Sequence, residues 1–177
     1  MVLFCFEQFV FECENRVTTS DERTKLTESV AAILERELDF TIEEWLKRVN
    51  LVPELTKVPL SDADRTGHLP QLFNDLINRL RLPRDTEPPI SIAAAVHGKL
   101  RFAQGYSAPM LVEESRIFQV STFRTLHLHH RRLNQQEVLL DVMTIADEAD
   151  GQLAETVRSF MAANTAASFP TGVGLQR

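Results

Sequence analysis

The segment from His97 to Ser107 is the feature that most restricts how this chain can fold. Glycine readily takes the left-handed conformation that closes a helix, and serine accepts hydrogen bonds from the free amides of a first turn. The sequence therefore predicts that one helix ends at Gly105 and that a second begins at Ser107. Tyr106 is expected to pack back over this turn. The chain thus contains a corner between two helices.

More polar side chains gather at this corner than a plain turn requires. His97 and Gln104 are seven positions apart with Arg101 between them, so all three lie on neighbouring parts of one helix face. Glu114, one turn into the next helix, is placed to pair with Arg101. Such a pair either contributes to a ligand pocket or only locks two helices together. The candidate ligand-binding or structural corner comprises His97, Arg101, Gln104, Gly105, Tyr106 and Glu114.

The composition favours an all-α fold. A chain of 177 residues with 44% hydrophobic and 25% charged residues is long enough for one domain. It has only six glycines, one tyrosine and one tryptophan, whereas leucine, alanine, glutamate and arginine are plentiful. The net charge of -6 argues against non-specific binding to nucleic acid. We expect neither a nucleic-acid nor a membrane partner.

Apolar periodicity and chain breakers predict about six helices, the last of them long. An amphipathic run spans 22–49, and the Thr41 to Glu44 capping box indicates that it divides near Asp39-Phe40 into two helices. A short helical turn is expected to begin at 61–64. Longer helices are expected at 69–82, 90–104 and 107 to about 133, with a proline-containing connector at 81–89. Ala93-Ala94-Ala95 would allow another helix to approach closely.

The last predicted helix, after Asn134, carries a heptad seam. Its apolar positions recur at alternating spacings of three and four, with Thr156 as a softer member. The seam is either buried inside the domain or pairs with a second copy of the chain, and it is the candidate dimer and output surface. Its residues are Leu139, Val142, Ala146, Ala149, Leu153, Thr156 and Phe160.

Three segments follow from this pattern: an apolar N-terminal arm at 1–20, a helical domain at 21–162 and a flexible tail at 163–177. The arm lacks a basic start, is interrupted by Glu7 and Gln8, and is too short to cross a bilayer. Cys5 and Cys13 are not spaced as a metal or redox motif, so a reducing, cytoplasmic setting is expected.

Motifs for catalysis and for metal or cofactor binding are missing from the sequence. His127 and His130 lie three apart on one face, but two ligands do not complete a site, and neighbouring arginines would repel a cation. Gly105 to Pro109 lacks both the final glycine and the preceding strand of a nucleophile elbow. Carboxylates such as Glu113 and Glu114, or Asp147, Glu148 and Asp150, are most simply interpreted as solvated helix faces. We therefore expect a non-enzyme without metal or cofactor.

A family resemblance rests on several of these residues. Trp45 lies on an early amphipathic helix, and Leu60-Ser61-Asp62 leads to His68-Leu69-Pro70-Gln71-Leu72-Phe73. His97-Gly98-x-x-Arg101-x-x-Gln104-Gly105-Tyr106 follows, and then Leu111-Val112-x-Glu114. Across about residues 28–160 this pattern resembles the N-terminal domain of RsbR-type co-antagonists of the stressosome, which also precedes sensor histidine kinases.

The resemblance implies a globin-like, helical sensory module that holds no haem, forms a homodimer and signals through its last helix to an output domain or protein partner. It assigns the family residues to His97, Arg101, Gln104, Gly105, Tyr106 and Glu114. No kinase or anti-sigma-type output segment follows the last helix in this sequence. Two alternatives stay open: a sensor that binds haem or another cofactor, with His97 or His68 as the axial ligand, and a structural helical subunit that recruits a partner.

Overall fold

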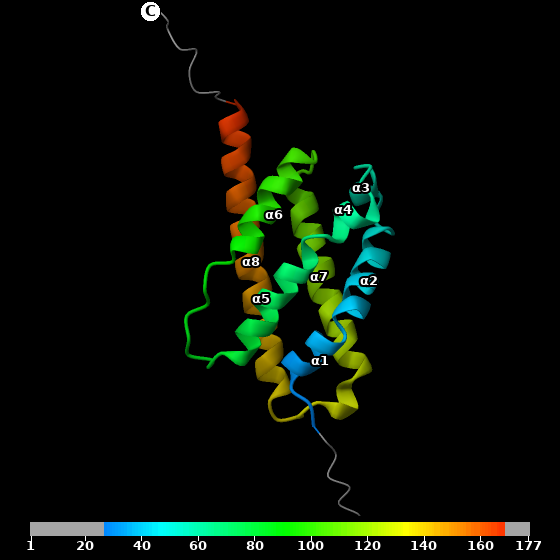
Figure 1. The fold of residues 1–177 in the computed structure, drawn as a ribbon, viewed down its shortest axis with the longest axis vertical. Coiled ribbons are helices and arrows are strands. Elements are labelled where there is room, and N and C mark those ends of the chain that lie inside the picture. The colour runs from blue at the N-terminus through cyan, green and yellow to red at the C-terminus, as the bar shows by residue number, and fades with distance from the viewer. Residues whose placement is uncertain (1–26, 169–177) are drawn as a thin grey trace, which may run out of the picture.

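The computed structural model describes residues 27–168, and this part of the chain is helical (Figure 1). Its one extended contact is an isolated bridge between Glu28 and Leu133. The elements are α1 (Val30–Arg36), α2 (Leu38–Val49), α3 (Pro53–Thr56), α4 (Asp62–Thr66), α5 (Leu69–Arg81), α6 (Ile92–Ala103), α7 (Ala108–Leu128), a 3-10 turn η1 (His130–Arg132) and α8 (Val138–Ser168). The all-α prediction is confirmed. The predicted arm at 1–20 lies outside the described residues.

The first amphipathic run divides as predicted, but for a different reason. The break falls at Glu37, between α1 and α2, and α1 begins after Ser29, whose side chain accepts from the Ala32 amide. The predicted capping box at Thr41 is wrong. The Thr41 hydroxyl is buried, donates back to the Glu37 carbonyl at 2.8 Å and lies 2.8 Å from the Thr125 hydroxyl of α7. A buried polar contact between helices therefore takes the place of the expected cap.

The corner between α6 and α7 has the predicted form. Gly105 has φ of 82°, and its amide donates to the Phe102 carbonyl at 3.0 Å. The Tyr106 amide donates to the Arg101 carbonyl at 3.0 Å. These two bonds form a Schellman motif, which satisfies the free carbonyls of the α6 end. Ser107 is the N-cap residue of α7. The corner therefore fixes the order in which Arg101, Tyr106 and the first turns of α7 meet.

Helix α6 lies directly against α8, as the small residues of α6 predicted (Figure 1). A Cβ atom at Gly98 would lie 2.2 Å from the Thr156 carbonyl oxygen. The hydroxyl of Thr156 donates to the Ala94 carbonyl at 3.2 Å, and that of Ser159 donates to the Ala95 carbonyl at 2.5 Å. Glycine at 98 is thus what allows the two backbones to come this close.

Burial varies along the predicted heptad seam of α8. Ala149, Thr156 and Phe160 are buried inside the domain, whereas Leu139 is 67% exposed. Val142, Ala146 and Leu153 are half-buried. The helix also continues past Ala162 to Ser168, where the sequence had predicted the flexible tail. The four alanines between 162 and 167 explain this difference, because alanine has the highest helix propensity.

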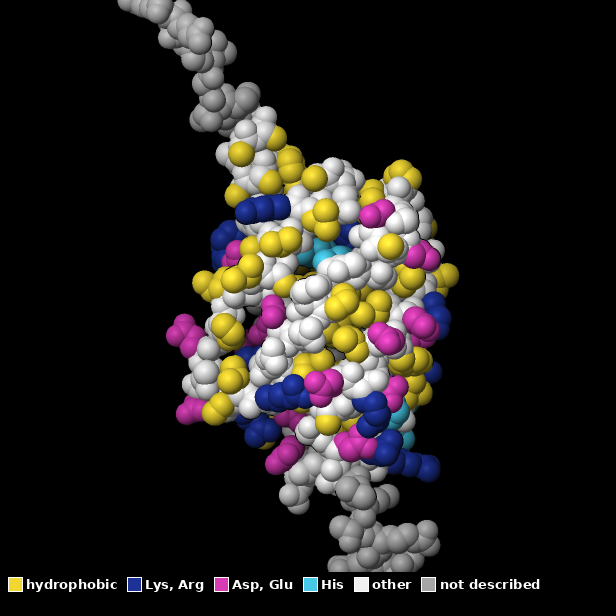
Figure 2. Space-filling view, viewed as in Figure 1, with side chains coloured by type: hydrophobic (Ala, Val, Ile, Leu, Met, Phe, Trp, Pro, Cys, Tyr) yellow, Lys and Arg dark blue, Asp and Glu magenta, His cyan; other side chains and the backbone are white. Residues whose placement is uncertain are grey.

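The described helices leave several large apolar side chains exposed. Some of them lie on α6, on α8 and on the segment before α6, and Figure 2 shows hydrophobic side chains (yellow) scattered over the face that it presents. These side chains are Ile90, Ile92, Val96, Leu139, Leu140, Met143 and Met161. No helix within 27–168 combines the length and the apolar character that crossing a bilayer requires.

Candidate functional site

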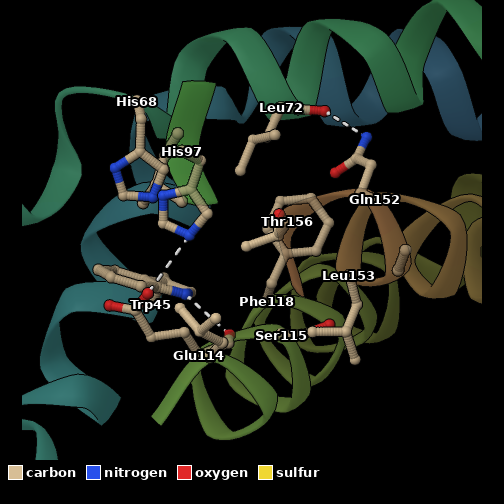
Figure 3. Close-up of a pocket in the computed structure, with 13 residues that line it drawn as sticks. Trp45, His68, Leu72, His97, Glu114, Ser115, Phe118, Gln152, Leu153 and Thr156 are labelled. Carbon is tan, nitrogen blue, oxygen red and sulfur yellow. Dashed lines mark hydrogen bonds and ion pairs between the residues drawn. The ribbon is translucent and has the colours of Figure 1, made fainter. Parts of the chain in front are cut away.

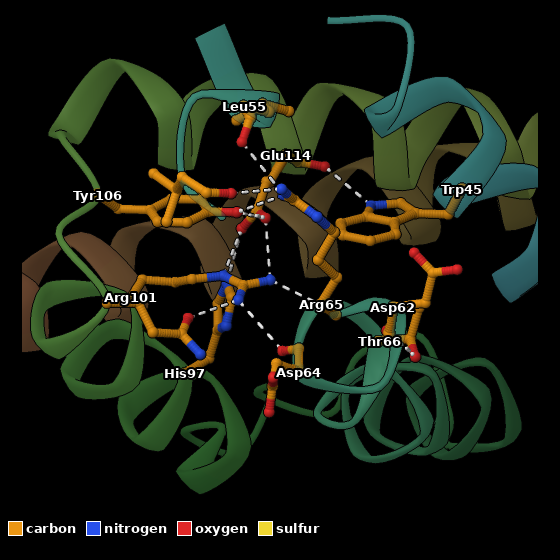
Figure 4. A network of polar contacts seen from close by, with 12 residues as sticks. Trp45, Leu55, Asp62, Asp64, Arg65, Thr66, His97, Arg101, Tyr106 and Glu114 are labelled. Atoms are coloured by element: carbon orange, nitrogen blue, oxygen red, sulfur yellow. Dashed lines mark hydrogen bonds and ion pairs between the residues drawn. The ribbon is translucent and has the colours of Figure 1, made fainter. Parts of the chain in front are cut away.

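A buried ion pair lies at the centre of the candidate site (Figure 4). Arg101 of α6 is fully buried and Glu114 of α7 is 3% exposed. The Arg101 Nε atom donates to Glu114 Oε2 at 3.0 Å, and its Nη2 atom lies 2.9 Å from Oε1. This two-bond geometry is the one in which guanidinium and carboxylate fit best. The pairing expected across the corner is therefore present.

Arg101 also donates hydrogen bonds to protein groups other than Glu114. Its Nη1 atom donates to Gln104 Oε1 at 2.7 Å, and its Nη2 atom donates to the Arg65 carbonyl at 3.0 Å. Tyr106 donates its hydroxyl to Glu114 Oε1 at 2.9 Å. The structure thus brings together the predicted residues His97, Arg101, Gln104, Tyr106 and Glu114, while Gly105 contributes the turn.

A second buried arginine, Arg65 of α4, extends this network and was missed by the sequence analysis. Its guanidinium donates to the Leu55 carbonyl at 3.2 Å, the Val58 carbonyl at 2.6 Å and the Tyr106 hydroxyl at 3.3 Å. It therefore ties the segment around α3 to the corner. The only sequence signal was its position on the short helical turn predicted after Ser61.

Two histidines adjoin the ion pair (Figures 3 and 4). His97 Nε2 lies 3.4 Å from Glu114 Oε2. The His68 ring, from the residue before α5, stacks on the His97 ring with 3.9 Å between centroids and 13° between planes. The Nδ1 atoms of both rings are buried and have no hydrogen-bond partner among the described residues. His68 therefore belongs to the site, although the candidate set drawn from the sequence did not contain it.

The environment sets the charge of each group. Burial lowers the pKa of His68 and of His97, so both imidazoles are neutral near pH 7. For Glu114, burial alone would raise the pKa, but the contacts with His97 and Arg101 outweigh burial and hold the pKa below its usual value. The site therefore combines two neutral imidazoles with an ionised carboxylate that is neutralised by a guanidinium.

A small pocket opens beside the histidines and ends against α8 (Figure 3). The space within it that water-sized molecules can occupy is about 30 Å³. Trp45, His68, His97 and Glu114 form one wall, and the facing wall includes Ala149, Gln152, Leu153 and Thr156 of α8. This space suits one or two waters or an ion. It does not accommodate a haem, because pockets for molecules of that size measure roughly 300 Å³ or more.

The interpretation of Glu114 and Glu148 as solvated is wrong, because both side chains are buried. Glu148 lies away from this pocket. Its side chain on α8 is buried, and Gln152 Nε2 donates to its Oε1 atom at 2.9 Å. Asp147 and Asp150 are exposed, as expected. Burial raises the pKa of Glu148, assisted by the charges of Asp75 and Asp147 and opposed by Gln152 and Arg79.

The raised pKa predicts that Glu148→Gln stabilises the protein at neutral pH. A raised pKa means that ionising this carboxyl costs folding free energy above the raised value, and that the cost is absent below the usual value of 4.5. Glutamine stays neutral and can still accept from Gln152. Urea unfolding should show a gain at pH 7 that shrinks at pH 4, with Asp147→Asn as the exposed control. An equal gain at both pH values would contradict the assignment.

Comparison with known proteins gives no match: no family model fits the chain, and no curated protein or solved structure is detectably similar to it.

Proposed function

We propose that this chain is a non-catalytic sensory or regulatory input domain of bacterial signal transduction, of the stress-response or histidine-kinase type, acting in the cytoplasm. The observation that carries the proposal is the position of the pocket. Its walls are the histidine and ion-pair cluster on one side and the last helix, α8, on the other. A molecule bound there would contact both, so a change at the site reaches α8 directly.

The family resemblance supports this proposal through the contacts its residues make. Residues that are far apart in the sequence, from Trp45 to Glu114, meet in one cluster. Trp45 Nε1 donates to the Glu114 carbonyl at 3.3 Å, and the Trp45 ring meets the His68 ring edge-on at 6.3 Å between centroids. A motif whose members contact one another is a better candidate for a shared role than scattered helical patterning. The globin-like, non-haem character of the module is part of the same proposal.

The chemistry of the cluster favours binding over catalysis. A general base acts best with a pKa near the working pH. Arg101 and His97 hold the pKa of Glu114 below its usual value, and Tyr106 and Arg101 occupy its Oε1 atom. The carboxylate is thus a poor proton acceptor. It is suited to hold its neighbours in place.

The exposed apolar side chains of α8 supply a surface for a second copy of the chain. Leu139, Leu140 and Met143 begin α8 on the outside of the domain, and Met161 lies toward its other end. Pairing of two α8 helices would bury these side chains and align the two C-terminal ends. A change of helix angle or register in such a pair is a known route for signals.

The proposed pairing of two α8 helices is tested by the oligomeric state of the full chain. Light scattering after size exclusion should show a dimer at micromolar concentration, and Met143→Glu should shift it toward monomer because a charge would be buried at the pairing surface. Leu51→Glu, at an 82% exposed apolar position beyond the end of α2, is the matched control and should leave the dimer intact. A monomeric parent chain would contradict the proposal.

Ligand sensing is tested by a thermal-shift screen of small molecules and metal ions. A compound that binds the native state raises the Tm, and His97→Gln should abolish that rise. If no compound raises the Tm of the parent chain while the dimer persists, the structural-subunit alternative replaces the sensory one.

A further inference from the structure

We infer that His68, His97 and Glu114 form a binding site for a divalent transition-metal ion of the zinc or iron type. The inference rests on the proposed function, since it names the class of ligand that the same pocket takes. Two imidazoles and one carboxylate are the donor set that such ions use in open sites.

The three side chains converge from three separate elements. His68 precedes α5, His97 lies on α6 and Glu114 lies on α7. One ligand atom from each lies within 4.8 Å of the other two. None of the three depends on its neighbours in the sequence for this arrangement. The convergence is therefore a product of the fold and not of a local turn.

The contact between His97 and Glu114 already has the separation that a metal needs. Bonds of about 2.0–2.2 Å place two ligand atoms of a tetrahedral zinc site roughly 3.4 Å apart. His97 Nε2 and Glu114 Oε2 lie 3.4 Å apart, which is longer than an ordinary N–H···O hydrogen bond of about 2.7–3.2 Å. An ion between the two atoms would bind the lone pair of His97 Nε2, and the single proton of the neutral imidazole would then lie on Nδ1, which has no partner among the described residues.

The His68 ring is the part that must move. Stacked rings cannot both direct a lone pair at one ion, because a metal binds in the plane of an imidazole. His68 makes no side-chain cap bond to α5, its Nδ1 has no partner, and its ring is held by the stack on His97 and the edge contact with Trp45. Turning this ring toward Glu114 therefore breaks no hydrogen bond of its Nδ1 and changes the surroundings of Trp45.

The groups that hydrogen-bond the Glu114 carboxylate would hold it in place as a metal ligand. Tyr106 and Arg101 hold its Oε1 atom at 2.9 Å each, and the Arg101 Nε atom also donates to Oε2 at 3.0 Å. These bonds fix the carboxylate with Oε2 facing His97, so an ion there would share Oε2 with Arg101. Carboxylate ligands are usually hydrogen-bonded in this way. The charge of Arg101 opposes a cation, so we expect weaker binding than in closed structural zinc sites. The pocket of about 30 Å³ leaves room for water as a further ligand.

The test is a calorimetric titration of the full chain with Zn²⁺, followed in parallel by fluorescence. Trp45 is the one tryptophan in the sequence, so its emission reports movement of the His68 ring. We expect one Zn²⁺ per chain and a change in emission. His68→Ala and His97→Gln should each weaken binding by at least about tenfold. Absence of Zn²⁺ binding by the parent chain would overturn the inference.

Three controls separate this site from others in the chain. His127→Ala/His130→Ala removes the exposed pair whose rings lie 5.6 Å apart, and Cys5→Ser/Cys13→Ser removes both thiols. Neither double variant should change the affinity. His68→Ala and His97→Gln should keep the helical circular dichroism of the parent. Their loss of affinity for Zn²⁺ is then not caused by a loss of fold. Loss of Zn²⁺ with either control pair, but not with His68→Ala, would overturn the assignment.

Failure of the inference and failure of the proposed function give different results. If Zn²⁺ does not bind but another compound raises the Tm through His97, the sensory function stands and the metal assignment falls. If Zn²⁺ binds at His68 and His97 but changes neither amide exchange along α8 nor the oligomeric state, the metal site stands and the sensory function falls.

Discussion

Arg101→Leu is expected to lower the free energy of unfolding by about 3–5 kcal/mol, the usual cost of removing one partner from a buried ion pair. Arg101 is fully buried, and its loss leaves the carboxylate of Glu114 ionised without its counter-charge. The carbonyl of Arg65 and the amide of Gln104 lose a donor as well. Urea unfolding at pH 7, followed by circular dichroism, measures the change.

Two variants show whether this effect belongs to the buried pair. Arg116→Leu breaks the exposed pair with Glu113 and should cost less than about 1 kcal/mol, because solvent screens exposed pairs. Arg101→Met/Glu114→Leu removes both charges and should recover part of the loss, since no buried charge is then left alone. A loss for Arg101→Leu no larger than that for Arg116→Leu would show that the pair contributes little.

Gly98→Ala is expected to destabilise the protein by about 1–3 kcal/mol, the range for forcing extra atoms into a packed contact. The new Cβ atom would lie 2.2 Å from the Thr156 carbonyl oxygen, and backbone cannot turn aside as a side chain can. Helices α6 and α8 would have to separate. Thermal unfolding of the variant measures this cost.

Gly151→Ala is the matched control for this prediction. Gly151 lies on α8, and a Cβ atom there would meet nothing within 4 Å. Alanine should therefore stabilise the helix by about 0.8–1 kcal/mol through propensity alone. If both substitutions stabilise the protein, the close approach of α6 and α8 at Gly98 is not present in solution.

Local signals in the sequence were sufficient to predict the longer helices and the corner, but not the short helix α3, which lies where a loop was expected after Pro53. Gly105 and Ser107 mark the end of one helix and the start of the next through backbone preferences that do not depend on the rest of the chain. The pairing of Arg101 with Glu114 was also accessible, because the corner fixes how one turn of α6 faces one turn of α7. Helical spacing is enough to place these side chains.

The contacts that could not be predicted join segments far apart in the sequence. The stacking of His68 on His97 and the hydrogen bond from Arg65 to the Tyr106 hydroxyl both depend on how α4 and α5 are placed beside the α6–α7 corner. Thr41 carried a capping pattern, but its contact with Thr125 across 84 positions overrides that local preference. The burial of Glu148 likewise follows from packing, since its neighbours Asp147 and Asp150 point outward.

Amide hydrogen exchange along α8 of the full chain, with and without saturating Zn²⁺, tests most directly whether the pocket is coupled to the last helix. Slower exchange should appear between Ala149 and Thr156, which face the pocket, and His68→Ala should remove it. The exposed segment 84–87 between α5 and α6, which does not line the pocket, should exchange equally in both conditions and serves as the internal reference. Bound Zn²⁺ with unchanged exchange throughout α8 would contradict the account.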